Sequence, residues 1–368
     1  MTTILKASDS AEFLGIIPAL AGFAPTSSLV LLPFHGKRTY GALRLDLPDD
    51  ECDAEYADTA VGLVTKVDDA DAVAVVVYVD DVPQSTHDGL VLPRLGLVDD
   101  VLAAVKEAGL RLVDALCVMP HGWASYLEDD PELLPLPEAH AAARDHAARD
   151  QRAGAGLPLA DLAEKERVGR AVRDLDAVLD RDGGGRLDGS ENPQALAALT
   201  LLEDMTWFFE SLLEDPAEQP PFVTAALLWC LHRPILRDVA LLQWATSYAG
   251  GEQAFDEQLD MSTCGGLYET ELNAVMIGRG PRPDPARLER ALEIVRLAAA
   301  RAPRAMRAGP LTLAAWFSWA LGRSTHAGVY LALVREIDPG YGLAGLIRTV
   351  IDAGMLPEWV FRRGPRYE

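Results

Sequence analysis

A run of eight uncharged and mostly β-branched residues at positions 72–79 (AVAVVVYV) constrains the fold more than any other feature of the sequence. A strand without alternation between apolar and polar residues is typical of one that is buried on both faces. Segments with helical spacing precede and follow it, at residues 51–67 and 96–108, so both faces can be covered. The sequence therefore predicts an α/β domain in which a mixed sheet is flanked by helices.

The neighbouring segments supply the rest of this domain. Asp9 and Glu12 have the spacing of a capping box and predict an amphipathic first helix. The apolar runs at residues 28–34 and 40–46, separated by a glycine-containing stretch, predict a hairpin. Residues 110–119 predict a fourth strand, which a right-handed crossover would join to the central strand if the two are parallel.

The second half of the chain has a different character. Pro131, Pro135 and Pro137 mark a boundary, and the residues beyond them are rich in Ala and Leu at helical spacing. Six of the seven Trp residues also lie there, which indicates a packed core. We therefore expect an α/β domain over residues 1–130 and an all-α helical domain over residues 131–368. The predicted helices span 137–149, 159–179, 193–213, 221–231, 235–248, 285–301, 311–321, 327–337 and 341–353.

Composition narrows the possible partners and the compartment. The chain has 33 basic and 56 acidic residues, so its net charge of -23 disfavours nucleic acid and anionic membranes as partners. Its four Cys form no CxxC pair, which favours reduced thiols in a cytoplasmic protein. The apolar run at residues 13–25 is too short to span a bilayer. The one basic region, residues 279–307, suits either an acidic partner or, as we favour, the chain's own carboxylates.

The segment DRDGGGRLDGSE at residues 180–191 fits a twelve-residue EF-hand calcium loop. Its expected ligands are Asp180, Asp182, the Arg186 carbonyl, Asp188 and a bidentate Glu191. The fifth loop position is a glycine, so water would have to replace one side-chain oxygen. The alternative interpretation is a solvated linker between two helices. Ca²⁺ is the only cofactor that a motif of this chain indicates.

A second candidate site follows the predicted strand at residues 110–119. His121, Trp123, Ser125 and Tyr126 lie there, and in open α/β sheets ligands bind beyond the carboxyl ends of the strands. His121 and Ser125 are residue types that serve acid-base or nucleophilic chemistry. No glycine-framed nucleophile motif surrounds Ser125, so a solvent-exposed loop is the alternative interpretation.

Four segments carry a resemblance to a known family. They are residues 23–29 (FAPTSSL), 43–48 (LRLDLP), 232–238 (HRPILRD) and 313–346 (LAAWFSWALG to DPGYGLAGL). Together they resemble the actinobacterial family catalogued as domain of unknown function 4192, which implies one evolutionary unit of full length and no particular activity. Members of that family carry paired Cys and Pro near the position of residues 123–126. This chain lacks those cysteines, so any thiol or metal role there would be lost.

The segment around Asp338 and Pro339 also resembles one tetratricopeptide unit, with Ala315, Ala327 and Leu331 at that repeat's small and large positions. The alternative interpretation of this single copy is an ordinary helical hairpin that ends in Asp-Pro-Gly. The sequence also shows no cluster of catalytic residue types. Our leading hypothesis from the sequence is therefore a non-enzymatic interaction or regulatory protein with an unidentified protein partner. The alternatives are an enzyme or small-ligand binder with a site at residues 121–126, and a calcium-binding helical module.

Overall fold

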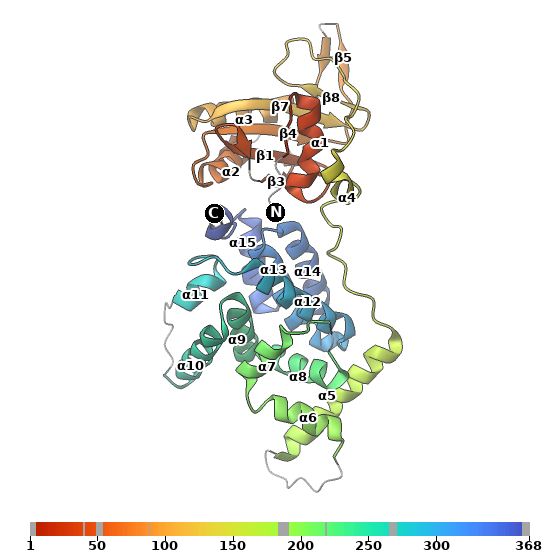
Figure 1. The fold of residues 1–368 in the computed structure, drawn as a ribbon, viewed down its shortest axis with the longest axis vertical. Helices are drawn as coiled ribbons and strands as arrows, with labels where there is room; N and C mark the ends of the chain where they lie inside the picture. The colour runs from red at the N-terminus through yellow and green to blue at the C-terminus, as the bar shows by residue number, and fades with distance from the viewer. Residues whose placement is uncertain are drawn as a thin grey trace. The chain divides into compact units, whose positions relative to one another are not determined.

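The computed structural model describes residues 5–39, 41–48, 54–87, 89–182, 191–217, 219–264 and 271–362, with backbone only at 181, 182 and 261–264. It divides into two compact units (Figure 1). Unit 1 comprises residues 1–153 and 361–368, and unit 2 comprises residues 154–360. Unit 1 holds a mixed sheet with flanking helices and unit 2 is helical, which confirms the expected fold class.

The sheet of unit 1 is built around the predicted central strand, β4 (Ala72–Tyr78). β4 pairs antiparallel with β1 (Ser28–His35) and parallel with β7 (Arg111–Met119). The order is β2-β1-β4-β7-β8, and β3 also pairs with β1. The shorter strands are β2 (Arg38–Thr39), β3 (Leu43–Asp46) and β8 (Gly122–Ser125). Every β4 residue except the last is buried, as the lack of polar alternation predicts.

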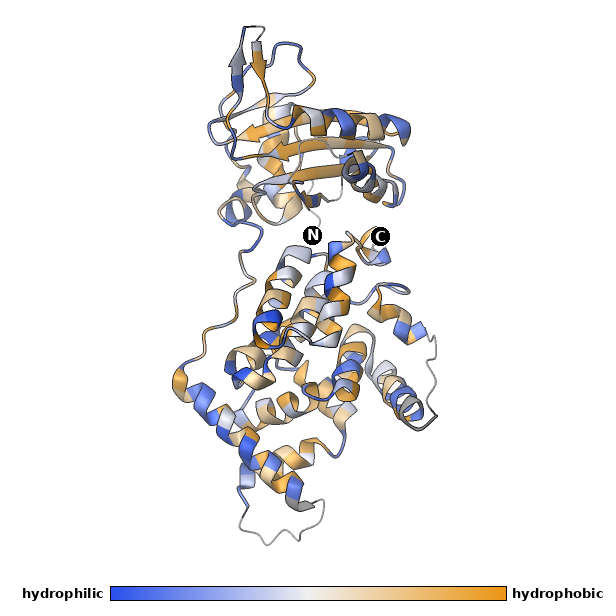
Figure 2. Ribbon diagram, turned by 180° about the vertical axis from the view of Figure 1, so that it is seen from behind, coloured by the Kyte–Doolittle hydropathy of each residue, from blue (hydrophilic) through white to orange (hydrophobic). Residues whose placement is uncertain are grey.

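Helices cover both faces of this sheet. Val73, Val75 and Val77 pack into a core with α2 (Ala54–Thr65) and α3 (Leu95–Glu107). The alternate residues of β4 pack on the other face against α1 (Ser10–Ala21). Figure 2 shows the strands in the orange of hydrophobic residues. α3 connects the parallel strands β4 and β7, as a crossover between parallel strands requires.

The capping box of α1 forms with a small shift. The Asp9 side chain accepts a hydrogen bond from the Glu12 amide at 2.8 Å, as predicted. The Glu12 carboxylate in turn accepts from the amide of Ser8, at 2.9 Å, rather than from that of Asp9. Gly22 ends the helix with φ of 84°, a left-handed conformation that favours glycine.

Two short pairings were not predicted from the sequence. β8 follows β7 through a tight turn, and β5 (Gln84–Thr86) pairs with β6 (Gly89–Val91) in a small hairpin. Strands of three or four residues are too short to give a clear alternation pattern. Both segments were therefore predicted as loops from the sequence.

The boundary between the two units lies between residues 153 and 154. From the sequence we predicted a domain boundary after residue 130. The intervening segment forms only η1 (Ala141–Ala143) and α4 (Arg144–Ala147) instead of one helix over 137–149. Its backbone bonds to the region of α1: the His140 amide donates to the Gly15 carbonyl at 3.0 Å, and the Ala24 amide donates to the Arg149 carbonyl at 2.8 Å. These bonds hold the segment in unit 1.

Unit 2 consists of packed helices. They are α5 (Leu162–Asp182), α6 (Pro193–Leu201), α7 (Met205–Leu212), α8 (Pro221–Leu231), α9 (Pro234–Ala245), α10 (Tyr248–Cys264), α11 (Glu271–Met276), α12 (Pro285–Arg301), α13 (Ala308–Ala320), α14 (Ser324–Ile337) and α15 (Gly342–Asp352), with short 3-10 turns η2 (Arg304–Met306) and η3 (Glu358–Val360). Every residue of α13 is buried, so this helix forms the centre of the unit.

Buried tryptophans fill the core of unit 2, as their number predicted. Trp244 packs edge-on against Phe209 at 5.9 Å between ring centroids, and Trp316 packs in the same way against Phe317 at 5.5 Å. The indole of Trp244 donates to the Phe209 carbonyl at 2.8 Å. Trp229 is only partly buried, and Trp207 is 54% exposed.

The predicted helix over residues 193–213 is two helices, because Asp204 begins a new one. Its side chain accepts a hydrogen bond from the Trp207 amide at 2.9 Å and caps α7. The sequence also did not predict α10 and α11. The predicted hairpin of α13 and α14 forms, with Ala315, Ala327 and Leu331 buried. Its relation to tetratricopeptide repeats stays a prediction. Within the described residues, no helix is both long and apolar enough to cross a bilayer.

Candidate functional site

A pocket of about 410 Å³ lies in unit 1 beyond the carboxyl end of β4. Its lining residues are Ser27, Asp46, Leu47, Pro48, Val79, Asp80, Asp81 and Arg94. The sheet register explains why they meet. Ser28, the first residue of β1, is paired with Asp46 of β3 on one side and with Tyr78 of β4 on the other. The start of β1 and the ends of β3 and β4 therefore reach the same edge.

Ser27 and Arg94 line this pocket in an unusual backbone conformation. Among the described residues, only Ser27, Asp69 and Arg94 are non-glycine residues with positive φ, at 44°, 58° and 61°. Such conformations are unfavourable for residues with a Cβ atom and cluster at functional sites. Two of these three residues belong to one pocket. This coincidence is the reason that we take the pocket as the candidate site.

Hydrogen bonds hold both residues in place. The Ser27 hydroxyl donates to an Asp80 carboxylate oxygen at 2.8 Å, which joins the start of β1 to the end of β4. An Arg94 guanidinium nitrogen donates to the Pro48 carbonyl at 3.0 Å, which joins the start of α3 to the end of β3. The walls of the pocket are thus tied together by side chains that also face into it.

Arg44 supports the rim from the sheet. Its Nε donates to the Ser28 hydroxyl at 2.6 Å, and its NH2 donates to an Asp46 carboxylate oxygen at 2.5 Å. The Arg44 side chain is only 10% exposed, whereas that of Asp46 is 86% exposed. The buried guanidinium therefore fixes the position of a carboxylate that is free to contact a ligand.

Tyr126 contacts the backbone next to the pocket-lining residue Arg94. Its hydroxyl donates to the Pro93 carbonyl at 2.6 Å, next to Arg94. Burial raises the pKa of Tyr126, and burial also raises the pKa of the adjacent Cys117 thiol to about 11. Both groups are therefore uncharged at neutral pH, and they stabilise the pocket wall rather than supply a nucleophile.

The structure separates the four residues predicted at the end of β7. His121 lies exposed in the turn between β7 and β8. Trp123 is buried in the core beneath α1, whereas Tyr126 packs with the core on the opposite face of the sheet. Ser125 accepts a hydrogen bond from the Leu127 amide at 3.2 Å. Alternation along β8 explains the separation, and of the four only Tyr126 touches the pocket region, through Pro93.

Most of the predicted calcium loop lies outside the described residues. Asp180 is exposed on α5, which extends through Asp182. Arg186 and Asp188 fall in the undescribed stretch. Glu191 is 8% exposed and precedes Asn192, whose side chain caps α6. Among the described residues, no three His, Cys, Asp or Glu side chains are arranged to hold a metal ion. Calcium binding stays a prediction.

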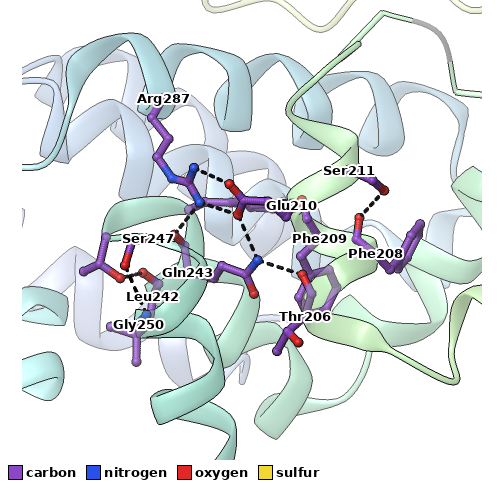
Figure 3. Close-up of polar contacts among 12 residues, drawn as sticks. Thr206, Phe208, Phe209, Glu210, Ser211, Leu242, Gln243, Ser247, Gly250 and Arg287 are labelled. Atoms are coloured by element: carbon purple, nitrogen blue, oxygen red, sulfur yellow. Dashed lines mark hydrogen bonds and ion pairs between the residues drawn. The ribbon is translucent and has the colours of Figure 1, made fainter.

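Unit 2 contains a partly buried polar network that the sequence did not predict (Figure 3). Arg287 of α12 forms a bidentate pair with Glu210 of α7, at 2.7 and 2.6 Å. The side-chain amide of Gln243, on α9, donates to Glu210 at 3.0 Å and to the Thr206 backbone carbonyl at 2.8 Å. The backbone carbonyl of Gln243 accepts a hydrogen bond from Arg287 at 3.0 Å. Three helices are thus joined through one carboxylate.

This network gives a prediction about pH. Hydrogen bonds from Arg287 are the main reason that the pKa of Glu210 lies below its ordinary value of 4.5. A lowered folded-state pKa means that the carboxylate stabilises the fold above its unfolded-state pKa and loses this contribution as pH falls through the folded value. We therefore expect the stability advantage of wild type over Glu210→Gln to be complete near neutral pH and to shrink as pH falls below 4.5.

Guanidinium unfolding of both proteins at a series of pH values, followed by circular dichroism, measures this difference. The other carboxylates titrate in both proteins, so they cancel in the comparison. A stability difference that stays constant from neutral pH down to about pH 3 would contradict the assigned role of Glu210.

The basic region of α12 contacts the chain itself. Its ion pairs are Arg279 with Glu358 at 3.8 Å, Arg287 with Glu210 at 2.6 Å and Arg301 with Glu164 at 2.5 Å. Arg296, Arg304 and Arg307 donate to backbone carbonyl oxygens. The expectation that this region docks against the chain's own carboxylates is confirmed for Arg279, Arg287 and Arg301, whereas the other three arginines bind backbone carbonyl oxygens instead.

A further buried pair joins α9 to the start of α15. Arg237 is 7% exposed, and its Nε donates to Asp238 at 2.8 Å. Its NH1 donates to the hydroxyl of Tyr341, the residue that precedes α15, at 2.9 Å. These contacts tie the helices.

The fold defines a class of protein in which an α/β unit, with a pocket at its strand ends, is followed along the chain by an all-helical unit. The chain matches the family described as Domain of unknown function (DUF4192) over residues 11–256 and 282–358. It therefore belongs to that family, as the resemblance predicted. No curated protein and no solved structure matches the chain.

The segments that carry the family resemblance meet in pairs. Ser27 from residues 23–29 and Asp46 from residues 43–48 both line the unit 1 pocket, because Ser28 pairs with Asp46 in the sheet. Arg237 from residues 232–238 contacts Tyr341 from residues 313–346 in unit 2. The first of these pairings was the signal that could have located the pocket from the sequence.

Proposed function

We propose that unit 1 binds a small polar ligand in the pocket beyond β4. The observation that carries this proposal is the presence of two strained residues, Ser27 and Arg94, in the wall of one pocket. The pocket volume of about 410 Å³ falls within the range of small-molecule sites. Its position beyond the carboxyl end of a parallel strand is where open α/β sheets bind ligands.

The net charge of the pocket-lining side chains favours one class of ligand over another. Asp46, Asp80 and Asp81 contribute three carboxylates, and Arg94 contributes one guanidinium that is already hydrogen-bonded to Pro48. The resulting negative potential favours ligands that carry an amine or another cationic group, and it disfavours simple anions. We expect the bound molecule to contact Asp80 and Asp46, which lie at the carboxyl ends of β4 and β3, on either side of β1.

Thermal-shift measurements with a panel of small amines, neutral polar compounds and carboxylates test this proposal. A ligand that binds only the folded protein raises the melting temperature by about 2–4 °C for each 1 kcal/mol of stabilisation in a unit of this size. We expect hits among the amines. Asp80→Asn and Asp46→Asn should remove them, because each takes away a carboxylate of the lining, while Asp99→Asn on the exposed surface of α3 should retain them. Hits that survive both pocket substitutions would contradict the proposal.

For the whole chain, we favour a regulatory or interaction role over catalysis. The Ser27 hydroxyl is engaged with Asp80, and the thiol and phenol behind the pocket wall, Cys117 and Tyr126, have raised pKa values and are uncharged at neutral pH. An enzyme that uses the same pocket is the alternative. Mass spectrometry of each hit after incubation with the protein separates the two: recovery unchanged fits binding, and conversion into a product would reverse the choice. The protein partner and the cytoplasmic location stay predictions.

Calcium binding is a second candidate, favoured by one feature of the described residues. Glu191, the expected bidentate ligand, is buried between α5 and α6 rather than extended into solvent. Replacing it by Gln removes the charge that an EF-hand loop needs at its last position. We expect millimolar Ca²⁺ to release or absorb heat with the wild type and not with Glu191→Gln in titration calorimetry. Identical heats for the two proteins would exclude this site.

A further inference from the structure

A second cavity, independent of the unit 1 pocket, lies in unit 2 beside the buried Arg287 pair. Its volume is about 210 Å³, and it lies between the end of α7 and the start of α12. Glu210 and Glu214 line it from one side, four residues and therefore about one helical turn apart. Asp284, Arg287 and Arg290 line it from the other, at spacings of three residues along one face.

Some charged side chains of the lining are paired with other groups in the described part of the protein, and others are not. Arg287 and Glu210 neutralise each other, and the Asp284 side chain caps α12 by accepting from the Ala286 amide at 2.9 Å. Within the described residues, neither the Arg290 guanidinium nor the Glu214 carboxylate has a polar partner. The Arg287 Nε is also buried without a hydrogen-bond partner there. The cavity therefore offers the Arg290 guanidinium on one wall and the Glu214 carboxylate on the other.

These features match a ligand that carries both charges. An anion alone would meet Glu214 and Asp284, and a cation alone would meet Arg290 and the positive end of the α12 dipole. A zwitterion satisfies both walls at once, with its carboxylate at Arg290 and its ammonium group at Glu214. The volume corresponds to about seven water molecules at roughly 30 Å³ each, which suits a ligand of similar heavy-atom count.

We propose that this cavity is a binding site for a small zwitterion of the amino-acid class. The Arg287 pair with Glu210 serves as its floor and fixes the spacing between α7 and α12 (Figure 3). Arg290 and Glu214 contact the ligand. The proposal does not depend on the unit 1 pocket, because none of the lining residues is shared.

Titration calorimetry of the full-length protein with L-alanine tests the proposal. Propionate and ethylamine are matched controls, because each retains only one of the two charged groups of L-alanine. We expect saturable binding of L-alanine and at least tenfold weaker binding of each control. If L-alanine gives no heat of binding at millimolar concentration, or if either control binds as tightly, the proposal is wrong.

Two substitutions locate the site. Arg290→Gln and Glu214→Gln should each weaken L-alanine binding at least tenfold without unfolding the protein, because both side chains are exposed and outside the buried pair. Arg282→Gln is the matched control, since this exposed arginine precedes α12 and does not line the cavity. Binding that is unchanged in Glu214→Gln, or lost equally in Arg282→Gln, would overturn the assignment to this cavity.

Discussion

Replacing Trp244 by Ala is expected to lower the free energy of unfolding by about 3–5 kcal/mol. The side chain is fully buried at the centre of unit 2, where its ring packs against Phe209 and Phe317 at centroid distances of 5.9 and 6.0 Å. Its indole nitrogen also donates to the Phe209 carbonyl at 2.8 Å. The substitution removes this apolar contact, opens a cavity and leaves a buried carbonyl without its donor.

Trp207→Ala is the matched control, because this tryptophan is 54% exposed on the first turn of α7. We expect it to change stability by no more than about 0.5 kcal/mol. Guanidinium unfolding followed by far-ultraviolet circular dichroism compares the two, since the helical signal does not depend on the substituted indole. Equal losses in the two variants would contradict the assigned core of unit 2.

Gly309→Ala is expected to lower the free energy of unfolding by about 3 kcal/mol. Gly309 lies in the first turn of α13, and a Cβ atom there would stand 2.3 Å from the carbonyl oxygen of Leu231. Because that oxygen belongs to the backbone at the end of α8, the clash is relieved only if the two helices move apart. α13 is buried along its whole length, so this movement would disturb the centre of unit 2.

For Gly328→Ala in α14 we expect the opposite effect, a small increase in the free energy of unfolding. A Cβ atom at that position meets nothing within 4 Å, so the substitution should stabilise the helix by about 0.5–1 kcal/mol through its better helix propensity. The same unfolding measurement serves both variants. A Gly309→Ala protein as stable as wild type would show that α8 and α13 do not approach as closely as described.

The elements that follow from local pattern were predictable. The unbroken apolar run at residues 72–79 predicts a buried strand. Asp9 and Gly22 are typical start and stop residues, and they mark the two ends of α1. The helix at 285–301 was predicted with the bounds that the structure gives to α12, because Asp284 and Pro285 are strong start signals. Short strands such as β8, and the break that Asp204 introduces, gave no comparable pattern.

The sites depend on long-range geometry that local pattern does not contain. Ser27, Asp46 and Asp80 meet only because β1 lies between β3 and β4 in a particular register. Nothing in the sequence marks Arg94 as a residue with positive φ, because that conformation is imposed by its surroundings. Glu210 and Arg287 are likewise 77 positions apart, and only the packing of α7 near α12 brings them together.

The most direct measurement of the central claim, that unit 1 binds a small polar ligand beyond β4, is methyl-detected nuclear magnetic resonance of the full-length protein. Leu47 and Val79 line the pocket and carry methyl groups, whereas Val101 is buried within α3 and does not line it. On titration with an amine from the thermal-shift panel, we predict saturable shifts at Leu47 and Val79 and little change at Val101. Binding that shifts other methyl groups and leaves Leu47 and Val79 unchanged would contradict the account.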